Sequence, residues 1–217
     1  MANILDYLDW RGDLTLSERG FNEVDNLLLA ELCYLDFDGL LPTRFDCPVP
    51  LPEAMARYDA VRHDESMGVL VPDEIPALGR KMAASARFRG IILCGYCSHT
   101  DDASQTQFSA LTALLPDGTA YVAYRGTDDT IVGWKEDFNM AFLTIIPAQR
   151  MAVEYLQAAA KALAALPLRV GGHSKGGNLA VFAAVFCGEA VQNQLLAIYN
   201  NDGPGFRTSL LPLAQHK

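Results

Sequence analysis

Residues 168–187 read LRVGGHSKGGNLAVFAAVFC and decide the fold. The short apolar run 168–170 predicts a strand, the apolar segment 178–187 predicts a helix, and a glycine-dense turn joins them. Gly172-His173-Ser174-Lys175-Gly176 matches G-x-S-x-G, a pattern that holds a serine on a strained turn between a strand and a helix. The flanking glycines allow neighbouring chain to pass where a side chain would collide. The stretch therefore predicts a nucleophile elbow with Ser174 at its apex.

The helix after Ser174 would assist acyl chemistry. Its N-terminus directs backbone N–H groups and the positive end of the helix dipole at the serine, where an oxyanion would form. A glycine-rich turn with an idle serine is the alternative interpretation. The spacing fits neither the dinucleotide-binding pattern nor the P-loop pattern.

The elements around this stretch predict an α/β protein. Apolar periodicity and a terminal Pro167 predict a helix over 150–166, and the run 195–199 predicts a strand. Runs at 108–115 and 119–124 flank a Pro-Asp-Gly turn and predict a hairpin, while 91–94 predicts a further buried strand. The alternation of strands and helices after residue 119 predicts a mostly parallel central sheet flanked by helices.

The chain is expected to form a single domain over 1–217. Residues 1–41 are predicted to be N-terminal helices, with Asn22 as an N-cap and Asp25 three positions later. Residues 42–90 hold six of the 11 prolines, which disfavours long regular elements and suggests a lid or a surface excursion. Residues 91–217 are expected to form the sheet core with the nucleophile elbow.

The composition excludes several classes of protein. With 17 Lys and Arg against 26 Asp and Glu, the net charge is −9, which disfavours binding to nucleic acid phosphates. No apolar run is long enough for a transmembrane segment, and the N-terminus lacks the pattern of a signal peptide. The 5 cysteines follow no framework spacing, which is typical of reduced thiols. We therefore expect a cytoplasmic protein.

A second segment carries a family resemblance. Tyr124-Arg125-Gly126-Thr127, followed by Trp134-Lys135-Glu136-Asp137, resembles the strand and loop of lipase class 3 enzymes, an α/β-hydrolase family. The segments 3–7, 172–180 and 202–206 are similar to those of an uncharacterised bacterial branch of lipase-like proteins, so the resemblance covers most of the chain. It implies an α/β-hydrolase-like fold and a serine hydrolase that acts on a small-molecule acyl ester or lipid, with no cofactor and no metal.

The resemblance also assigns roles around Ser174. It implies that Thr127 provides one oxyanion donor and that the backbone N–H of Lys175 provides the other. The residues themselves also allow structural roles. Arg125 could pair with a carboxylate such as Asp137 to fix the loop, and Trp134 is expected to be a packed aromatic side chain.

The general base is less clearly marked. After Ser174 the acids are Glu189 and Asp202, and the sole histidine is His216. One interpretation makes Ser174, Asp202 and His216 a catalytic triad in the usual α/β-hydrolase order. The other holds that the chain lacks the C-terminal strands that carry the acid and base, since full domains commonly reach about 250 residues.

The remaining histidines are weaker candidates for the base. The side chain of His173 should point away from the site, because neighbouring residues on an extended segment alternate in direction. His99 follows a strand and His63 lies in the proline-rich segment.

Two alternatives to a hydrolase stay open. The first is a catalytically incomplete lipase-like protein whose elbow is structural or forms a ligand-binding pocket. The second is a thiol redox protein that uses Cys94 and Cys97, although this pair ends a strand rather than starting a helix. A sheet without further strands would expose an edge near 195–199, which suggests a homodimer.

Overall fold

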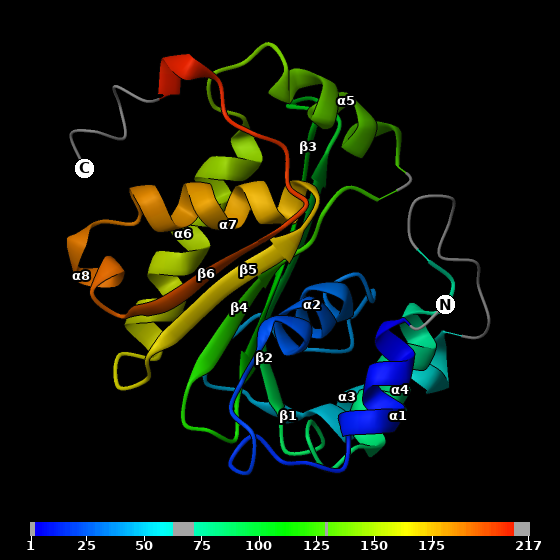
Figure 1. The fold of residues 1–217 in the computed structure, drawn as a ribbon. Helices are drawn as coiled ribbons and strands as arrows, with labels where there is room; N and C mark the ends of the chain where they lie inside the picture. Colours follow the sequence, from blue (N-terminus) through cyan, green and yellow to red (C-terminus); the bar gives the residue numbers. More distant parts are fainter. Residues whose placement is uncertain (1–2, 63–71, 129, 211–217) are drawn as a thin grey trace.

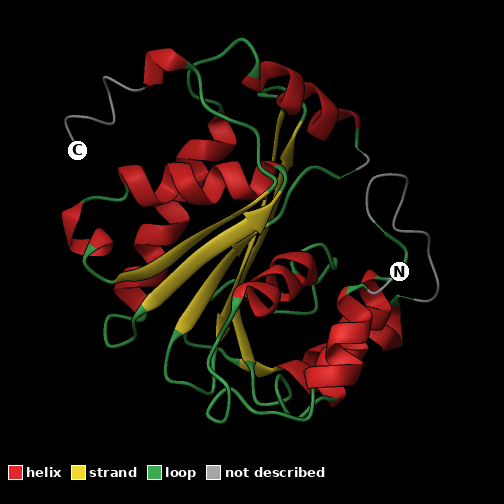
Figure 2. Cartoon of the chain, in the orientation of Figure 1, coloured by secondary structure: helices red, strands yellow, loops and turns green. Residues whose placement is uncertain are grey.

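The computed structural model describes residues 3–62, 72–128 and 130–210. Its described strands form one mixed sheet in the order β1-β2-β3-β4-β5-β6, with helices on both faces (Figures 1 and 2). The strands are β1 (Val49–Pro50), β2 (Ile92–Asp101), β3 (Thr106–Leu114), β4 (Ala120–Tyr124), β5 (Leu168–His173) and β6 (Leu195–Asn201). The helices are α1 (Ile4–Arg11), α2 (Glu23–Leu32), α3 (Leu51–Val61), α4 (Ile75–Ala84), α5 (Ile131–Met140), α6 (Pro147–Ala162), α7 (Lys175–Phe186), α8 (Glu189–Gln192) and the 3₁₀ helix η1 (Thr208–Leu210).

The class is α/β, but the expectation of a mostly parallel sheet was wrong. β1 to β4 pair in antiparallel fashion, and only β4-β5 and β5-β6 are parallel. Antiparallel neighbours need no crossover helix, so β2, β3 and β4 follow one another through turns. Helical crossovers between parallel strands connect β4 to β5 and β5 to β6. The predicted hairpin is confirmed, with Leu111 of β3 opposite Ala123 of β4.

The sheet separates two apolar cores. Successive side chains of β4 point to opposite faces, so Tyr121 packs with α1–α4 whereas Val122 packs with α6 and α7. Figure 1 shows these two groups of helices on either side of the sheet. Because β4 is buried on both faces, its sequence is continuously apolar rather than alternating.

The predicted N-cap at Asn22 is confirmed, and α2 begins directly after it. The Asn22 side chain accepts hydrogen bonds from the backbone N–H groups of Val24 and Asp25, and the Asp25 carboxylate accepts one from Asn22 N–H. Asp25 also forms a buried ion pair with Arg87, whose guanidinium donates to the carbonyls of Leu14, Arg19 and Gly20. This arginine therefore ties the turn before α2 to the segment after α4.

The prolines of 42–90 were expected to disfavour long regular elements, yet two helices of 11 and 10 residues form there. α3 and α4 lie there, and their residues Leu51, Met55 and Leu78 belong to the core on the α1–α4 face. A proline occupies the first turn of each helix, where its missing N–H has no intrahelical acceptor to lose. The prolines therefore start these helices instead of preventing them.

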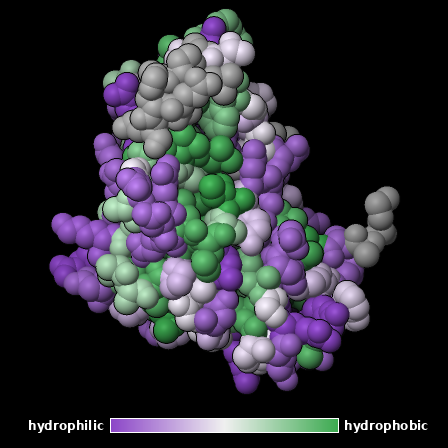
Figure 3. All heavy atoms as spheres, turned by 60° about the vertical axis from the view of Figure 1, so that its left-hand side comes forward, coloured by the Kyte–Doolittle hydropathy of each residue, from purple (hydrophilic) through white to green (hydrophobic). Residues whose placement is uncertain are grey.

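β6 lies at one end of the described sheet, and β5 is its only strand neighbour there. Leu196 and Ile198 of β6 are both about half exposed, at 55% and 47%. Figure 3, in which the side of the molecule carrying α7 and α8 comes forward, shows an apolar band on that face. Among the described helices, none combines the length and the apolar character needed to cross a bilayer.

Candidate active site

Ser174 lies on a sharp turn between β5 and α7. Its backbone has φ 55° and ψ −128°, a left-handed conformation that non-glycine residues rarely adopt. Such a conformation costs about 1–3 kcal/mol and persists only where surrounding structure holds it. Here Ser174 N–H donates to Asn201 O at 2.9 Å, and Ser174 O accepts from Gly177 N–H at 2.9 Å. The predicted strand and helix around this serine are thus confirmed, and the turn between them is strained.

The two motif glycines are required by close backbone contacts. A Cβ on Gly172 would lie 2.5 Å from Tyr124 O and 2.4 Å from the carbonyl carbon of Gly176. A Cβ on Gly176 would lie 2.1 Å from Tyr124 O. Since all these atoms belong to the backbone, no side-chain rotation could relieve the collision. The end of β4 therefore packs directly against the elbow.

This packing brings the loop after β4 to the serine. Thr127 is buried, and its hydroxyl donates to Asp137 at 2.6 Å. The backbone N–H groups of Thr127 and Lys175 donate to no acceptor in the described part of the chain. Lys175 is the first residue of α7, so its N–H has no intrahelical partner. Two backbone donors are consequently free, one on the residue that follows Ser174 and one in the loop whose Gly126 lies against the carbonyl of His173.

Asp202 lies at the same edge of the sheet. β5 and β6 are parallel, with His173 opposite Asn201, so Ser174 and Asp202 follow adjacent strand ends. Asp202 is exposed and adopts φ 56°, the second strained residue of this edge. No hydrogen bond joins the Ser174 hydroxyl to any side chain in 3–62, 72–128 or 130–210. His216 and His63 lie outside the described residues.

The described histidines occupy other positions. His99 is exposed on β2, opposite Phe108 of β3, and β3 and β4 separate it from β5. His173 lies on the α2 side, where its Nδ1 is 3.2 Å from Glu31 Oε1 and 3.3 Å from the Tyr34 hydroxyl. Burial raises the pKa of Glu31 to about 7. Burial also lowers the pKa of His173, and the nearby charge of Asp202 partly opposes this second shift. Near neutral pH this pair is therefore a hydrogen bond rather than an ion pair.

The environment of the Lys175 side chain was not predicted from the sequence. It is buried, and its ammonium donates to Glu136 Oε2 at 2.6 Å, Gln107 O at 2.8 Å and Gln107 Oε1 at 2.7 Å. Burial raises the pKa of Glu136, and Lys175 opposes that shift. This cluster joins the residue after Ser174 to β3 and α5. Nothing in the sequence marks it, because lysine and glutamate usually lie at the surface.

Arg125 does pair with a carboxylate of its loop, but the partner is Asp128 at 3.1 Å, and the Asp137 carboxylate accepts from Thr127 instead. The expectation for Trp134 was wrong, because its side chain is 57% exposed rather than packed. The face of α5 that carries Glu136 packs against the protein, so the opposite face, which carries Trp134, is exposed to solvent.

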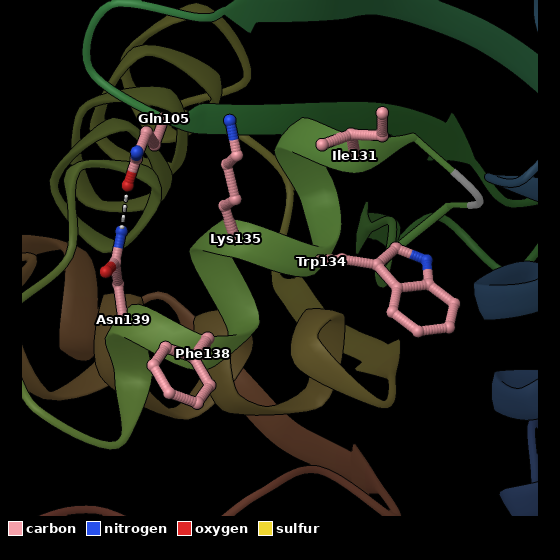
Figure 4. Close-up of a pocket in the computed structure, with 6 residues that line it drawn as sticks. All are labelled: Gln105, Ile131, Trp134, Lys135, Phe138 and Asn139. Carbon is pink, nitrogen blue, oxygen red and sulfur yellow. Dashed lines mark hydrogen bonds between the residues drawn. The ribbon is translucent and has the colours of Figure 1, made fainter.

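The outward face of α5 is apolar. Ile131, Trp134 and Phe138 recur at helical spacing and are 75%, 57% and 68% exposed. Phe142 and Leu143, just beyond the helix, are also exposed. Figure 4 shows Trp134 and Phe138 projecting from α5. Both side chains line a shallow pocket of about 490 Å³.

Neither metal nor thiol chemistry is supported by the described residues. In those ranges no cluster of His, Cys, Asp and Glu has the form of a metal site. Cys94 and Cys97 are free thiols, and burial raises the pKa of both, to about 11 for Cys94. A raised pKa makes a thiol a poor redox nucleophile.

Comparison with known proteins gives one family. A search of curated proteins and a search of solved structures each found no match. The family model described as Mbeg1-like matches residues 82–217, more than half of the chain, including the elbow and the loop after β4. The chain therefore belongs to the Mbeg1-like family.

Proposed function

We propose that this protein is a serine hydrolase that cleaves carboxylic esters of apolar acyl groups. The observation that carries the proposal is the strained Ser174 between a strand and a helix, beside two unoccupied backbone donors. Catalytic serines need this exposed position, and oxyanion holes are built from such donors. The resemblance to lipase class 3 agrees with this activity, and we propose further that the sheet and its helices form an α/β-hydrolase-like fold.

In the proposed reaction, the Ser174 hydroxyl attacks the ester carbonyl and loses its proton to a general base. The carbonyl oxygen becomes an oxyanion, which accepts hydrogen bonds from the N–H groups of Thr127 and Lys175. The alcohol leaves with a proton, and water then releases the acid from Ser174. We propose His216 as the base and Asp202, which follows the adjacent strand, as its orienting acid.

Intact mass after treatment with a fluorophosphonate probe tests this proposal. We expect one probe per chain in the parent and in Ser98→Ala, a control at an exposed serine of β2. Ser174→Ala should take up none, because an activated serine is the group that these probes modify. A parent chain that remains unlabelled while folded would contradict the hydrolase and favour the catalytically incomplete alternative, with the elbow as a binding or structural feature.

The exposed face of α5 supports an apolar substrate. Burial of a large apolar side chain contributes about 1.5–3 kcal/mol, so contact of α5 with a lipid phase would hold the enzyme at its substrate. We expect Trp134→Gln with Phe138→Gln to lower hydrolysis of an emulsified long-chain ester by about tenfold or more. Hydrolysis of a short soluble ester should stay unchanged. Lys135→Gln, on the same helix, serves as the control, and an equal loss on both esters would contradict a lipid contact.

We propose further that β6 pairs with β6 of a second copy. An edge strand offers unpaired backbone groups, and half-exposed Leu196 and Ile198 add apolar surface. Sedimentation velocity should show a dimer for the parent and a monomer for Leu196→Lys with Ile198→Lys. Val61→Lys, a control at an exposed apolar residue of α3, should remain dimeric. A monomeric parent at all concentrations would rule this pairing out.

The compartment is also part of the proposal. All 5 cysteines are free in the structure, including the exposed Cys47. Because unpaired thiols persist in reducing surroundings, we propose that the protein acts in the cytoplasm.

A further inference from the structure

A cavity of about 350 Å³ lies on the face of the sheet opposite α6 and α7. Ile4 and Leu5 of α1 and Ile75 and Leu78 of α4 form its apolar walls. Glu31 of α2 and His173 at the end of β5 line its other side. Figure 1 shows α1, α2 and α4 together on this side of the sheet. This volume falls within the range of small-molecule sites, about 300–1,000 Å³.

The polar end of the cavity is formed by three side chains that converge. Glu31 Oε1 and the Tyr34 hydroxyl both approach Nδ1 of His173, at 3.2 and 3.3 Å. The Glu31 side chain is only 9% exposed. A buried carboxyl group with an imidazole and a phenol beside it can both accept and donate hydrogen bonds to a ligand.

The charge of the lining favours a cation. Glu31 and Glu74 line the cavity, and among the described residues of its lining there is neither lysine nor arginine. His173 does not supply the missing charge near neutral pH, since burial lowers its pKa. A buried carboxylate is stable only when an opposite charge or several hydrogen bonds compensate it. A ligand with a positive head would provide that charge, and a ligand with a negative head would face two acids.

We propose that this cavity binds a primary alkylammonium compound, with its ammonium against Glu31 and Tyr34 and its aliphatic chain along α1 and α4. The ammonium can donate three hydrogen bonds, to the Glu31 carboxylate, to the Tyr34 oxygen and to water at the opening. The site is independent of the proposed hydrolase, because it uses no atom of Ser174, Thr127 or Asp202.

Isothermal titration of the full chain with octylamine, octanoate and octanol tests the proposal. The three probes share an eight-carbon chain and differ in the charge of the head. We expect one octylamine molecule to bind per chain, at least about tenfold more tightly than octanol. Octanoate should bind more weakly than either of them. A tighter octanoate, equal affinities for octylamine and octanol, or no binding would overturn the proposal.

Variants distinguish binding of octylamine in the cavity from nonspecific attraction of cations to a chain with net charge −9. Glu31→Gln should lower the affinity for octylamine by at least about tenfold and leave the affinity for octanol unchanged. Glu154→Gln, at an exposed position of α6, should change neither. Ile4→Trp, which fills the cavity from α1 without replacing a fully buried residue, should abolish binding of all three probes. Unchanged octylamine affinity in Glu31→Gln or in Ile4→Trp would overturn the assignment.

Discussion

Replacement of Lys175 by methionine is expected to lower the free energy of unfolding by about 3–5 kcal/mol at neutral pH. The variant leaves the Glu136 carboxylate fully buried without its cation. One oxygen of that carboxylate, Oε1, already has no hydrogen-bond partner among the residues that the structure describes. Removal of one member of a buried ion pair is costly because the remaining charge is uncompensated. Urea denaturation measures the loss.

The loss of stability in Lys175→Met should increase as the pH rises. Burial already raises the pKa of Glu136, and without Lys175 nothing opposes that shift. The native state of Lys175→Met would then hold a proton that the unfolded chain releases at its lower, ordinary pKa. Stability contributed by that proton is present at acidic pH and is lost as the pH rises through the raised pKa. The deficit of the variant should therefore be smaller at pH 5 than at pH 8.

Two further variants decide whether the ion pair is the cause. Lys175→Met with Glu136→Leu removes both charges and should recover most of the lost stability. Lys135→Met, at the exposed lysine beside Glu136, should change stability by less than about 0.5 kcal/mol. A double variant as unstable as Lys175→Met alone would contradict the explanation, since packing rather than charge would then dominate.

Replacement of Gly176 by alanine is expected to damage the elbow itself. Its Cβ would meet Tyr124 O at 2.1 Å and the carbonyl carbon of Arg125 at 3.0 Å, so α7 must move away from the loop that carries Thr127. Overpacking of this kind costs about 1–3 kcal/mol or more. Displacement of catalytic groups by about 1 Å can lower rates on the order of 10²-fold, so labelling of Ser174 by the fluorophosphonate probe should slow by that factor.

Gly20→Ala is the matched control for this variant. A Cβ on Gly20 meets no atom within 4 Å, so both stability and labelling should remain those of the parent. Thermal unfolding and the time course of labelling are the two measurements. Labelling of Gly176→Ala at the parent rate would show that the close approach of β4 to α7 does not hold the oxyanion donors in place.

The sequence by itself determined the local features. The elbow needs glycine at 172 and 176 because the collisions occur against the fixed backbone of the turn and of β4, whatever side chains surround them. The capping box of Asn22 and Asp25 involves residues three positions apart, and the β3-β4 hairpin closes through a short turn. Each of these features depends on neighbours in the chain, so a pattern in the sequence identifies it.

Outside the β3-β4 hairpin, the tertiary structure alone decided the direction of strand pairing, and it also decided the surroundings of the site. Short apolar strands carry no mark of whether their neighbour is parallel, so the antiparallel pairing of β1 with β2 and of β2 with β3 was not predicted. His173 meets Tyr34 139 positions away in the chain, and Lys175 meets Glu136 39 positions away. Both contacts exist because α2 and α5 pack against the ends of particular strands. Packing between distant segments, which no local pattern records, therefore placed the charges around Ser174.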